Sequence, residues 1–345
     1  MYFCCLKTDD LHPFTDSLMN ALYPLKFNPL FKDKIWGGQK VKSILGMDFS
    51  PLPNCGEVWT LSGYKGNESV VSNGFLKGND LRELIEVYME DLLGDKVFET
   101  YGEEFPLLIK LLDSNDWLSI QVHPDDELAA EKHDGFGKTE MWYVMQADED
   151  AELISGFRSS ITKEEYIDKL KGGKLTSLLN YEKAAKGDVF FMPAGRVHAL
   201  GPGLLIAEIQ QSSDITYRIY DFDRRDDKGN TRELHTEQAL DALDFEYHAD
   251  IRTDYKPVPD QTVSLVQCPY FETNLMHFGT TLVKNYTGLD SFVILFCTEG
   301  KCQVQYEGGV ESLKAGEVIL IPASLEGKIA LVPSVETRVL EVYIP

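Results

Sequence analysis

The sequence predicts a mainly β protein, built from two jelly-roll β-barrels with a small helical portion. From Gly187 to Pro345 the chain consists mostly of short β-rich runs separated by Gly, Pro, Asn and Asp. This density of strands and turns favours a sandwich or jelly roll over a parallel α/β sheet. A weak internal repeat indicates that the β unit occurs twice, and few segments show helical periodicity.

The repeat aligns KGDVFFMPAGRVHAL (186–200) with AGEVILIPASLEGKIAL (315–331). Each copy has a Gly, five residues and a Pro within the same apolar pattern. The second copy keeps the strand and the turn but has Gly327 where the first copy has His198. We therefore predict that the first barrel carries a site and that the second lacks it, with a linker near residues 250–262.

Hydrophobic spacing predicts three helical segments among the strands. NDLRELIEVYMEDLLGDKVFETYG (79–102) opens with an Asn-Asp pair that offers an N-cap. Residues 162–182 are typical of two short helices interrupted by a Gly-Gly pair, and TEQALDAL (236–243) is the third segment. The β-like runs of the first half are GEVWTLSG (56–63), ESVVSNG (68–74), PLLIKLLDS (106–114) and WLSIQVHP (117–124).

Composition limits the classes of partner. The 345 residues carry 33 Lys and Arg against 56 Asp and Glu, a formal net charge of −23. A surface this acidic repels nucleic acid and anionic membranes, so a phosphorylated ligand needs a local basic cluster. No apolar run approaches the roughly 20 residues of a membrane helix, and the N-terminus lacks the pattern of a signal peptide. The six cysteines do not space like a disulfide framework, which favours a reducing, cytoplasmic setting.

One segment gives the strongest local indication of chemistry. GDVFFMPAGRVHALG reads G-x5-P-x-G-x2-H, the second signature of the cupin superfamily, whose turn directs His198 into the mouth of a barrel. SIQVHPDDE offers Gln121 and His123 on one strand face, and GKTEMWYVM offers Glu140. Such nitrogen and oxygen donors suit a catalytic zinc site, although ligand type alone leaves manganese, iron, cobalt and nickel open.

Five blocks resemble, in order, motifs of the type I mannose-6-phosphate isomerase family: FKDKIWGG, QVHPDDELA, GKTEMWYVM, PAGRVHALG and SSDITYRIYDFDR. The resemblance extends from about Leu22 to Pro345. It is to the short bacterial form, because only residues 155–186 stand where longer members carry a helical domain.

The resemblance implies two cupin-type barrels and one Zn²⁺ per chain. The ligands that it implies are Gln121, His123, Glu140 and His198.

The resemblance also implies a substrate site. Arg218 corresponds to the family's active-site arginine, and Asp214 belongs to the same block. Lys138 corresponds to a lysine that contacts substrate, Ser119 to a hydroxyl in the phosphate pocket, and Lys110 to a second cation. Strand alternation agrees, since it places Lys138 on one face with the expected ligand two residues later. The alternatives are a solvated Lys138 and an Arg218 that serves only an ion pair with a neighbouring Asp.

The implied reaction interconverts mannose 6-phosphate and fructose 6-phosphate through an enediol. It needs a base near the carbon acid and an electrophile for the developing charge on oxygen. Arg218 is expected to stabilise charge, and Glu208 is the candidate base, with Asp214 or a zinc-bound hydroxide as alternatives. Glu208 as a buried salt-bridge partner is equally compatible with the sequence. A non-catalytic sugar-phosphate-binding cupin, another cupin enzyme and an isomerase of another hexose phosphate are the competing functions.

The expected organisation has three parts. Residues 1–18 form a poorly ordered extension, and translation starts either at Met1 or at Met19. Residues 19–250 form the catalytic cupin domain with helical insertions, and residues 262–345 form a degenerate barrel without metal. The expected partner is a small sugar phosphate, without nucleic acid or membrane, and the protein is a monomer or a homodimer.

Overall fold

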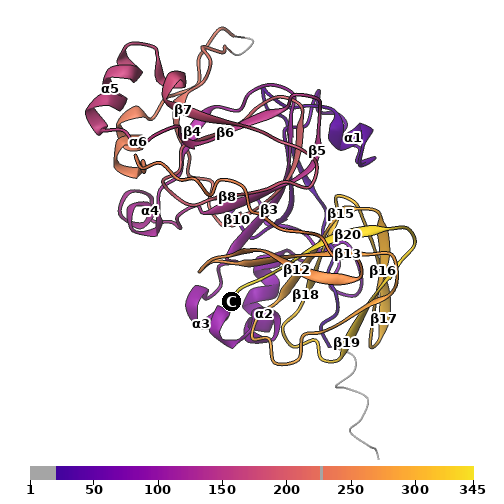
Figure 1. The fold of residues 1–345 in the computed structure, drawn as a ribbon. Coiled ribbons are helices and arrows are strands. Elements are labelled where there is room, and N and C mark those ends of the chain that lie inside the picture. Colours follow the sequence, from indigo (N-terminus) through magenta and orange to yellow (C-terminus); the bar gives the residue numbers. More distant parts are fainter. Residues whose placement is uncertain (1–20, 226–227) are drawn as a thin grey trace, which may run out of the picture.

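The computed structural model describes residues 21–225 and 228–345 (Figure 1). The predictions for residues 1–18 and for a start at Met19 lie outside the described residues. Within the described part of the chain, no helix combines the length and the apolar character needed to cross a membrane.

The chain is mainly β, as predicted, and all strand pairs are antiparallel. Two sheets form the first β unit. The six-stranded sheet runs in the order β1 (Leu30–Lys32), β2 (Glu57–Ser62), β3 (Leu107–Ser114), β10 (Leu204–Gln211), β5 (Glu140–Ala147) and β8 (Val189–Met192). The five-stranded sheet runs in the order β11 (Tyr217–Tyr220), β4 (Ile120–Val122), β9 (His198–Leu200), β6 (Glu152–Phe157) and β7 (Leu179–Lys183). Apolar side chains of both sheets, such as Val144 and Leu153, share one core.

Two further sheets form the second β unit. One runs in the order β12 (Gln261–Gln267), β13 (Glu272–Phe278), β20 (Thr337–Tyr343), β15 (Val293–Glu299) and β18 (Val318–Ile321). The other runs in the order β14 (Leu282–Asn285), β19 (Lys328–Pro333), β16 (Lys301–Tyr306) and β17 (Gly309–Lys314). Their facing side chains, for example Leu295 and Leu331, make a separate core.

The two units repeat the same turn. The N–H of Gly187 donates to the carbonyl oxygen of Val144 at 2.8 Å, and the N–H of Gly316 donates to that of Cys297 at 2.8 Å. Both glycines have positive φ, 92° and 87°, a conformation that side chains with a Cβ rarely adopt. The weak sequence repeat therefore corresponds to one structural position in each unit.

Few helices accompany the sheets. They are α1 (Lys40–Ser43), α2 (Leu81–Leu93), α3 (Asp95–Tyr101), α4 (Asp126–His133), α5 (Lys163–Lys171), a 3₁₀ helix (Leu175–Leu178) and α6 (Thr236–Ala242). Asp80 caps α2 and forms a capping box with Glu83, because each side chain accepts a hydrogen bond from the other residue's N–H.

Three local predictions differ from the structure. Residues 162–182 were expected to contain two short helices, but the second is only the 3₁₀ helix Leu175–Leu178, and Leu179–Lys183 pairs with β6 as β7. Residues 79–102 were expected to form one helix, but Gly94, with a φ of 97°, separates α2 from α3. In ESVVSNG, Val70 and Val71 form isolated bridges rather than a strand. Pairing with a distant strand decided the first case, since it supplies the backbone hydrogen bonds that a helix would otherwise make.

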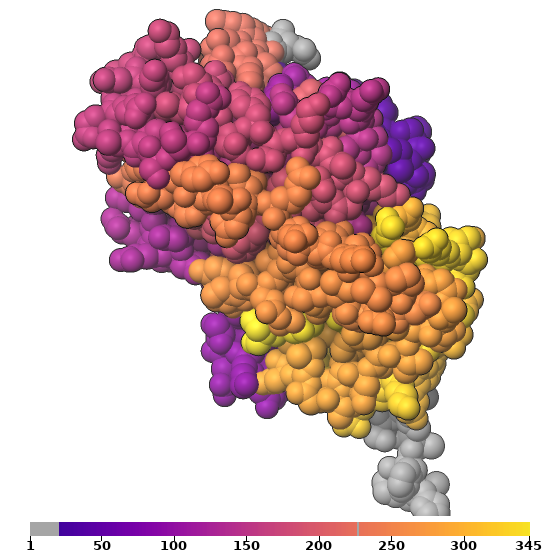
Figure 2. Space-filling view, viewed as in Figure 1, coloured from indigo at the N-terminus to yellow at the C-terminus, as the bar shows by residue number. Residues whose placement is uncertain are grey.

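Helices α2 and α3 precede most of the first unit in sequence but lie on the second unit (Figures 1 and 2). The N–H of Phe292 donates to the carbonyl oxygen of Leu93 at 3.1 Å, and the Asp290 carboxylate accepts the N–H of Asp95 at 2.6 Å. The rings of Phe105 and Phe292 lie 4.8 Å apart. This helical segment thus ties the two units together.

Candidate metal centre and active site

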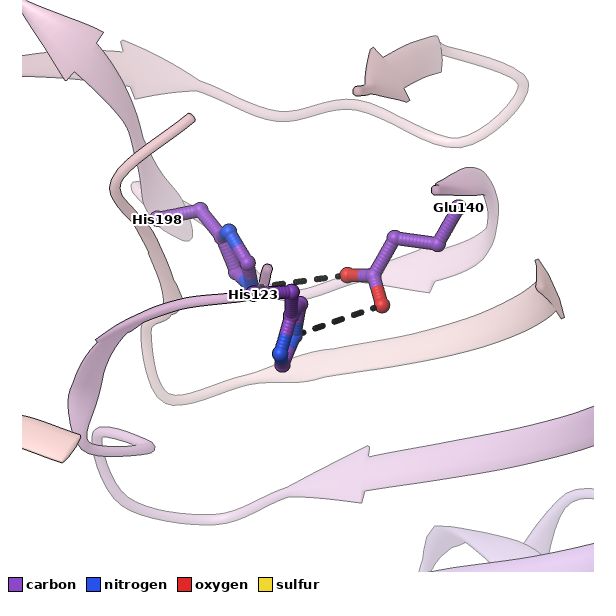
Figure 3. A group of neighbouring side chains, drawn as sticks. All are labelled: His123, Glu140 and His198. Atoms are coloured by element: carbon purple, nitrogen blue, oxygen red, sulfur yellow. Dashed lines mark ion pairs between the residues drawn. The ribbon is translucent and has the colours of Figure 1, made fainter. Parts of the chain in front are cut away.

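Three buried side chains of the first unit converge on one point (Figure 3). Donor atoms of His123, Glu140 and His198 all lie within 4.8 Å of one another. His123 directly follows β4, Glu140 begins β5 and His198 begins β9. The two carboxylate oxygens of Glu140 lie 3.6 Å from His123 Nε2 and 3.4 Å from His198 Nε2.

The turn after β8 positions His198. Gly195 adopts a φ of 87°, and its N–H donates to the carbonyl oxygen of His123 at 2.9 Å. The glycine of the G-x5-P-x-G-x2-H pattern therefore links the strand of one histidine to the turn that precedes the other.

Backbone carbonyls orient both imidazoles. His123 Nδ1 donates to the carbonyl oxygen of Ile215 at 2.8 Å, and His198 Nδ1 donates to that of Arg196 at 2.8 Å. Each Nε2 therefore carries a lone pair that faces Glu140. Burial and the neighbouring Lys138 lower the pKa of His123, and they lower the pKa of His198 to about 4. Both rings are neutral at pH 7, as metal ligation requires.

Gln121 joins this group from β4. It lies opposite His198 in the register of β4 and β9, and its side-chain nitrogen is 3.3 Å from His198 Nε2. The Ser119 hydroxyl donates to Gln121 Oε1 at 3.3 Å. If the Gln121 amide rotates by a half turn, its Oε1 faces the point on which His123, Glu140 and His198 converge. The hydrogen-bonding groups around the amide decide between the two orientations.

These residues fit a divalent cation. Glu140 Oε1 is buried and accepts no hydrogen bond. The Lys138 ammonium lies 2.6 Å from Glu140 Oε2 and 2.8 Å from His123 Nε2, so the group already attracts positive charge. Two neutral imidazoles, a carboxylate and an amide oxygen match the nitrogen and oxygen donors of catalytic zinc sites, with other first-row metals compatible.

A cavity of about 250 Å³ lies beside the candidate metal donors His123, Glu140, His198 and Gln121. Its walls hold every residue predicted from the sequence for catalysis or substrate binding: Lys110, Ser119, Lys138, Glu208, Asp214 and Arg218. Lys138 is buried, which excludes the alternative of a solvated surface lysine. Gln121 also lines the cavity, so the candidate metal donors border the space lined by the predicted substrate-binding residues.

Glu208 has two roles open to it in this cavity. Its Oε1 accepts a hydrogen bond from the Trp142 indole at 3.0 Å, and its Oε2 lies 3.4 Å from the Lys110 ammonium. Burial and the carboxylate of Glu140 raise the pKa of Glu208 despite the lysine. The carboxylate is therefore a salt-bridge partner that also faces the cavity.

Three charged residues of the cavity were not predicted from the sequence: Lys34, Glu57 and Arg232. Lys34 lies 2.9 Å from Glu57, and Glu57 also accepts the indole N–H of Trp59 at 2.8 Å. Burial favours the neutral form of Glu57, but Lys110 and Lys34 outweigh it and lower its pKa to about 2. A charged residue at the start of the apolar run GEVWTLSG was the available signal.

Arg218 points into the same cavity. Its Nη1 donates to the carbonyl oxygen of Glu233 at 2.7 Å, and its Nε is buried without a partner. Asp221 pairs instead with Arg224 and Arg232. Among the described residues, no carboxylate oxygen lies within 4.0 Å of Arg218, so the alternative of an Arg218–Asp221 ion pair does not hold.

Comparisons with known proteins agree on one family. The model of the phosphomannose isomerase type I catalytic domain matches residues 24–156, and an AraC-like ligand binding domain matches residues 279–340. Mannose-6-phosphate isomerase of Streptococcus mutans serotype c is 38% identical over 304 residues, covering 88% of this chain and 93% of the relative. Mannose-6-phosphate isomerase ManA of Bacillus subtilis is 37% identical over 309 residues, covering 88% and 94%.

A solved structure agrees with these relatives. The crystal structure of mannose 6-phosphate isomerase from Bacillus subtilis matches with a TM-score of 0.80 at 34% identity, covering 93% of this chain and 99% of that chain. Identity at this level over nearly the full length of both chains, with the same cupin fold, establishes the relationship. The chain belongs to the type I mannose-6-phosphate isomerase family of enzymes, in its short bacterial form.

Proposed function

We propose that this protein is a zinc-dependent isomerase that interconverts mannose 6-phosphate and fructose 6-phosphate through an enediol intermediate. The observation that carries the proposal is a group of buried metal donors beside a cavity lined by cations and by carboxylates. Relatives of this length and identity carry the name of that enzyme.

The cations of the cavity account for a phosphorylated substrate. The chain as a whole carries a formal charge of −23, which opposes the approach of a phosphate ester. Lys138 and Ser119 would contact the substrate, and Lys110 would add a second positive charge. Arg218 would orient the substrate and stabilise developing negative charge, since its guanidinium offers several donors in a fixed plane.

Glu208 is the proposed base that carries the proton between the two carbons. A base works best when its pKa lies near the working pH, and the raised pKa of Glu208 moves it in that direction. Asp214, which lines the same cavity, is the alternative. Zinc, held by Gln121, His123, Glu140 and His198, would supply Lewis-acid polarisation of the substrate oxygens.

The proposed organisation follows the repeat. Residues 19–250 would form the catalytic domain, and residues 262–345 would form a second barrel that binds no metal. The four described cysteines are free thiols, which agrees with a cytoplasmic setting.

A coupled assay for fructose 6-phosphate formed from mannose 6-phosphate tests the function. We expect turnover that a chelator abolishes and that added zinc restores. Glucose 6-phosphate serves as the comparison substrate. A protein that binds mannose 6-phosphate without turnover would be a sensor instead, and faster turnover of glucose 6-phosphate would identify a different hexose-phosphate isomerase.

A further inference from the structure

Three hydrogen bonds attach Arg218 to the segment that precedes α6. The backbone N–H of Arg218 donates to His235 Nδ1 at 3.1 Å. The N–H of His235 donates to the carbonyl oxygen of Arg218 at 2.7 Å. The third bond runs from the guanidinium to the carbonyl oxygen of Glu233, as described above. Two residues of this segment therefore hold both the backbone and the side chain of Arg218.

This attachment replaces a missing strand. β11 is at the edge of its sheet and pairs only with β4, where Arg218 lies opposite Gln121. The register of that pair is irregular between Arg218 and Tyr220, so β4 alone fixes the arginine weakly. His235 occupies the open side of β11, and its imidazole nitrogen accepts the N–H that a neighbouring strand's carbonyl would accept.

His235 is itself held in place. Its carbonyl oxygen accepts the N–H of Ala239 in the first turn of α6, at 2.9 Å, and its ring lies 6.4 Å from that of Tyr217. The phenol oxygen of Tyr217 lies 2.7 Å from His133 Nε2. The Arg232 side chain, just upstream, is fixed by the buried carboxylate of Asp221 at 2.8 Å. The segment is thus anchored on both sides of the residues that hold Arg218.

We propose that His235 is a positioning residue that aims the Arg218 guanidinium into the substrate cavity. The inference rests on the proposed isomerase function. His235 does not line the cavity, so it acts through Arg218 and not on the substrate. Nδ1 accepts from Arg218, which assigns the imidazole hydrogen to Nε2.

Two substitutions separate positioning from packing. His235→Phe keeps a ring against Tyr217 but loses the acceptor, and His235→Asn keeps an acceptor at about the position of Nδ1. We expect His235→Phe to lower kcat by about tenfold to a hundredfold with a smaller change in KM, because misplacement by about 1 Å can cost that much. His235→Asn should recover most of this loss. His248→Phe removes a histidine that pairs with Asp244 and does not line the cavity, so it is the matched control and should keep the wild-type kcat.

A double substitution tests the route of the effect. If His235 acts only through Arg218, His235→Phe should add no further loss of turnover to Arg218→Ala. Independent, multiplying losses would overturn the inference, and so would a fully active His235→Phe protein or a His235→Asn protein as impaired as it.

The wild-type protein separates this inference from the function on which it rests. Absence of isomerase turnover in the wild type would refute the proposed function. Calorimetric binding of mannose 6-phosphate to the wild type and to His235→Phe would then test the positioning alone. Equal affinities would refute it, and weaker binding by the variant, recovered in His235→Asn, would support it.

Discussion

The ammonium group of Lys284 lies 2.9 Å from the carboxylate of Glu341 inside the second β unit. Tyr286 donates its hydroxyl hydrogen to the same carboxylate at 2.7 Å. Tyr286 directly follows β14, as His123 directly follows β4 in the first unit. A lysine and a tyrosine thus face a buried carboxylate in the second unit.

The sheet registers relate the two units. Glu208 lies opposite Trp142, and Glu341 lies opposite Leu295. Trp142 lies two residues before Val144, whose carbonyl accepts the N–H of Gly187. Leu295 likewise lies two residues before Cys297, whose carbonyl accepts the N–H of Gly316. Glu341 is therefore the counterpart of Glu208, and its buried negative charge is balanced by a side chain of the protein.

The first prediction concerns metal content. In the first unit Glu140 lies opposite Met192, and at the corresponding position of the second unit Val293 lies opposite Ile321. The second unit therefore has a valine where the first unit has the carboxylate of Glu140. We expect about one zinc ion per chain in elemental analysis. His198→Ala should lose both zinc and turnover, because too few protein donors remain. A reproducible second equivalent of zinc, or full zinc content in the variant, would contradict this.

The second prediction concerns the stability of the second unit. Lys284→Met leaves the buried Glu341 carboxylate without its cation, and breaking such a pair costs about 3 kcal/mol of unfolding free energy. Urea unfolding should show this loss while kcat stays near the wild-type value. The exposed Lys328→Met is a control for removing one surface charge and should leave stability nearly unchanged. A large loss of turnover in folded Lys284→Met would point to a role in catalysis instead.

Arg218→Lys is the third test. Lysine keeps the positive charge but loses the planar set of donors, including the one that reaches the Glu233 carbonyl. We expect kcat/KM to fall by about a hundredfold, within the range for removing one donor to a developing charge. The melting temperature should change little. Turnover close to the wild-type value would reduce Arg218 to a structural residue.

Glu208→Gln tests the base. The amide keeps the size of the side chain but cannot accept the substrate proton, so kcat should fall by about a hundredfold or more. In the wild type, activity should rise with pH as Glu208 loses its proton, at a pH above that of an ordinary glutamate. The parallel variant Asp214→Asn discriminates between the two candidates. A larger loss in Asp214→Asn than in Glu208→Gln would transfer the role to Asp214.

The last prediction concerns acid stability. The pKa of Glu57 falls from 4.5 to about 2 on folding, because Lys110 and Lys34 outweigh burial. A carboxyl pKa that is lowered on folding stabilises the folded state at pH values above the pKa of the unfolded chain. This stabilisation is lost as the pH falls through the pKa of the folded chain. A shift of this size corresponds to about 3 kcal/mol. The stability difference between the wild type and Glu57→Gln should therefore be constant above about pH 4.5 and shrink toward pH 2. A difference independent of pH in urea unfolding would refute this assignment.

Much of the local structure, and the group of candidate metal donors, could be predicted from the sequence. The Asn-Asp pair before α2 contains the residue that caps it, because capping depends on a few neighbouring residues. The turn pattern indicated His198, and strand alternation placed Gln121 and His123 on one face. The helix cap is confirmed because it depends on residues separated by only a few positions. The convergence of His123, Glu140 and His198 agrees with the predicted ligand set, and metal binding by that set stays a prediction.

Only the tertiary structure decided which distant groups meet. Leu179–Lys183 became a strand because β6 offered it hydrogen bonds, although its own spacing favoured a helix. Lys34 and Glu57 form an ion pair across the cavity wall, and His235 reaches Arg218 on the open side of an edge strand. Sheet register and loop path set these contacts, and both depend on packing between segments that are far apart in the chain. The amino-acid sequence by itself thus determined the fold class and the types of candidate metal donor. Folding determined which distant residues orient the side chains of the site and shift their pKa values.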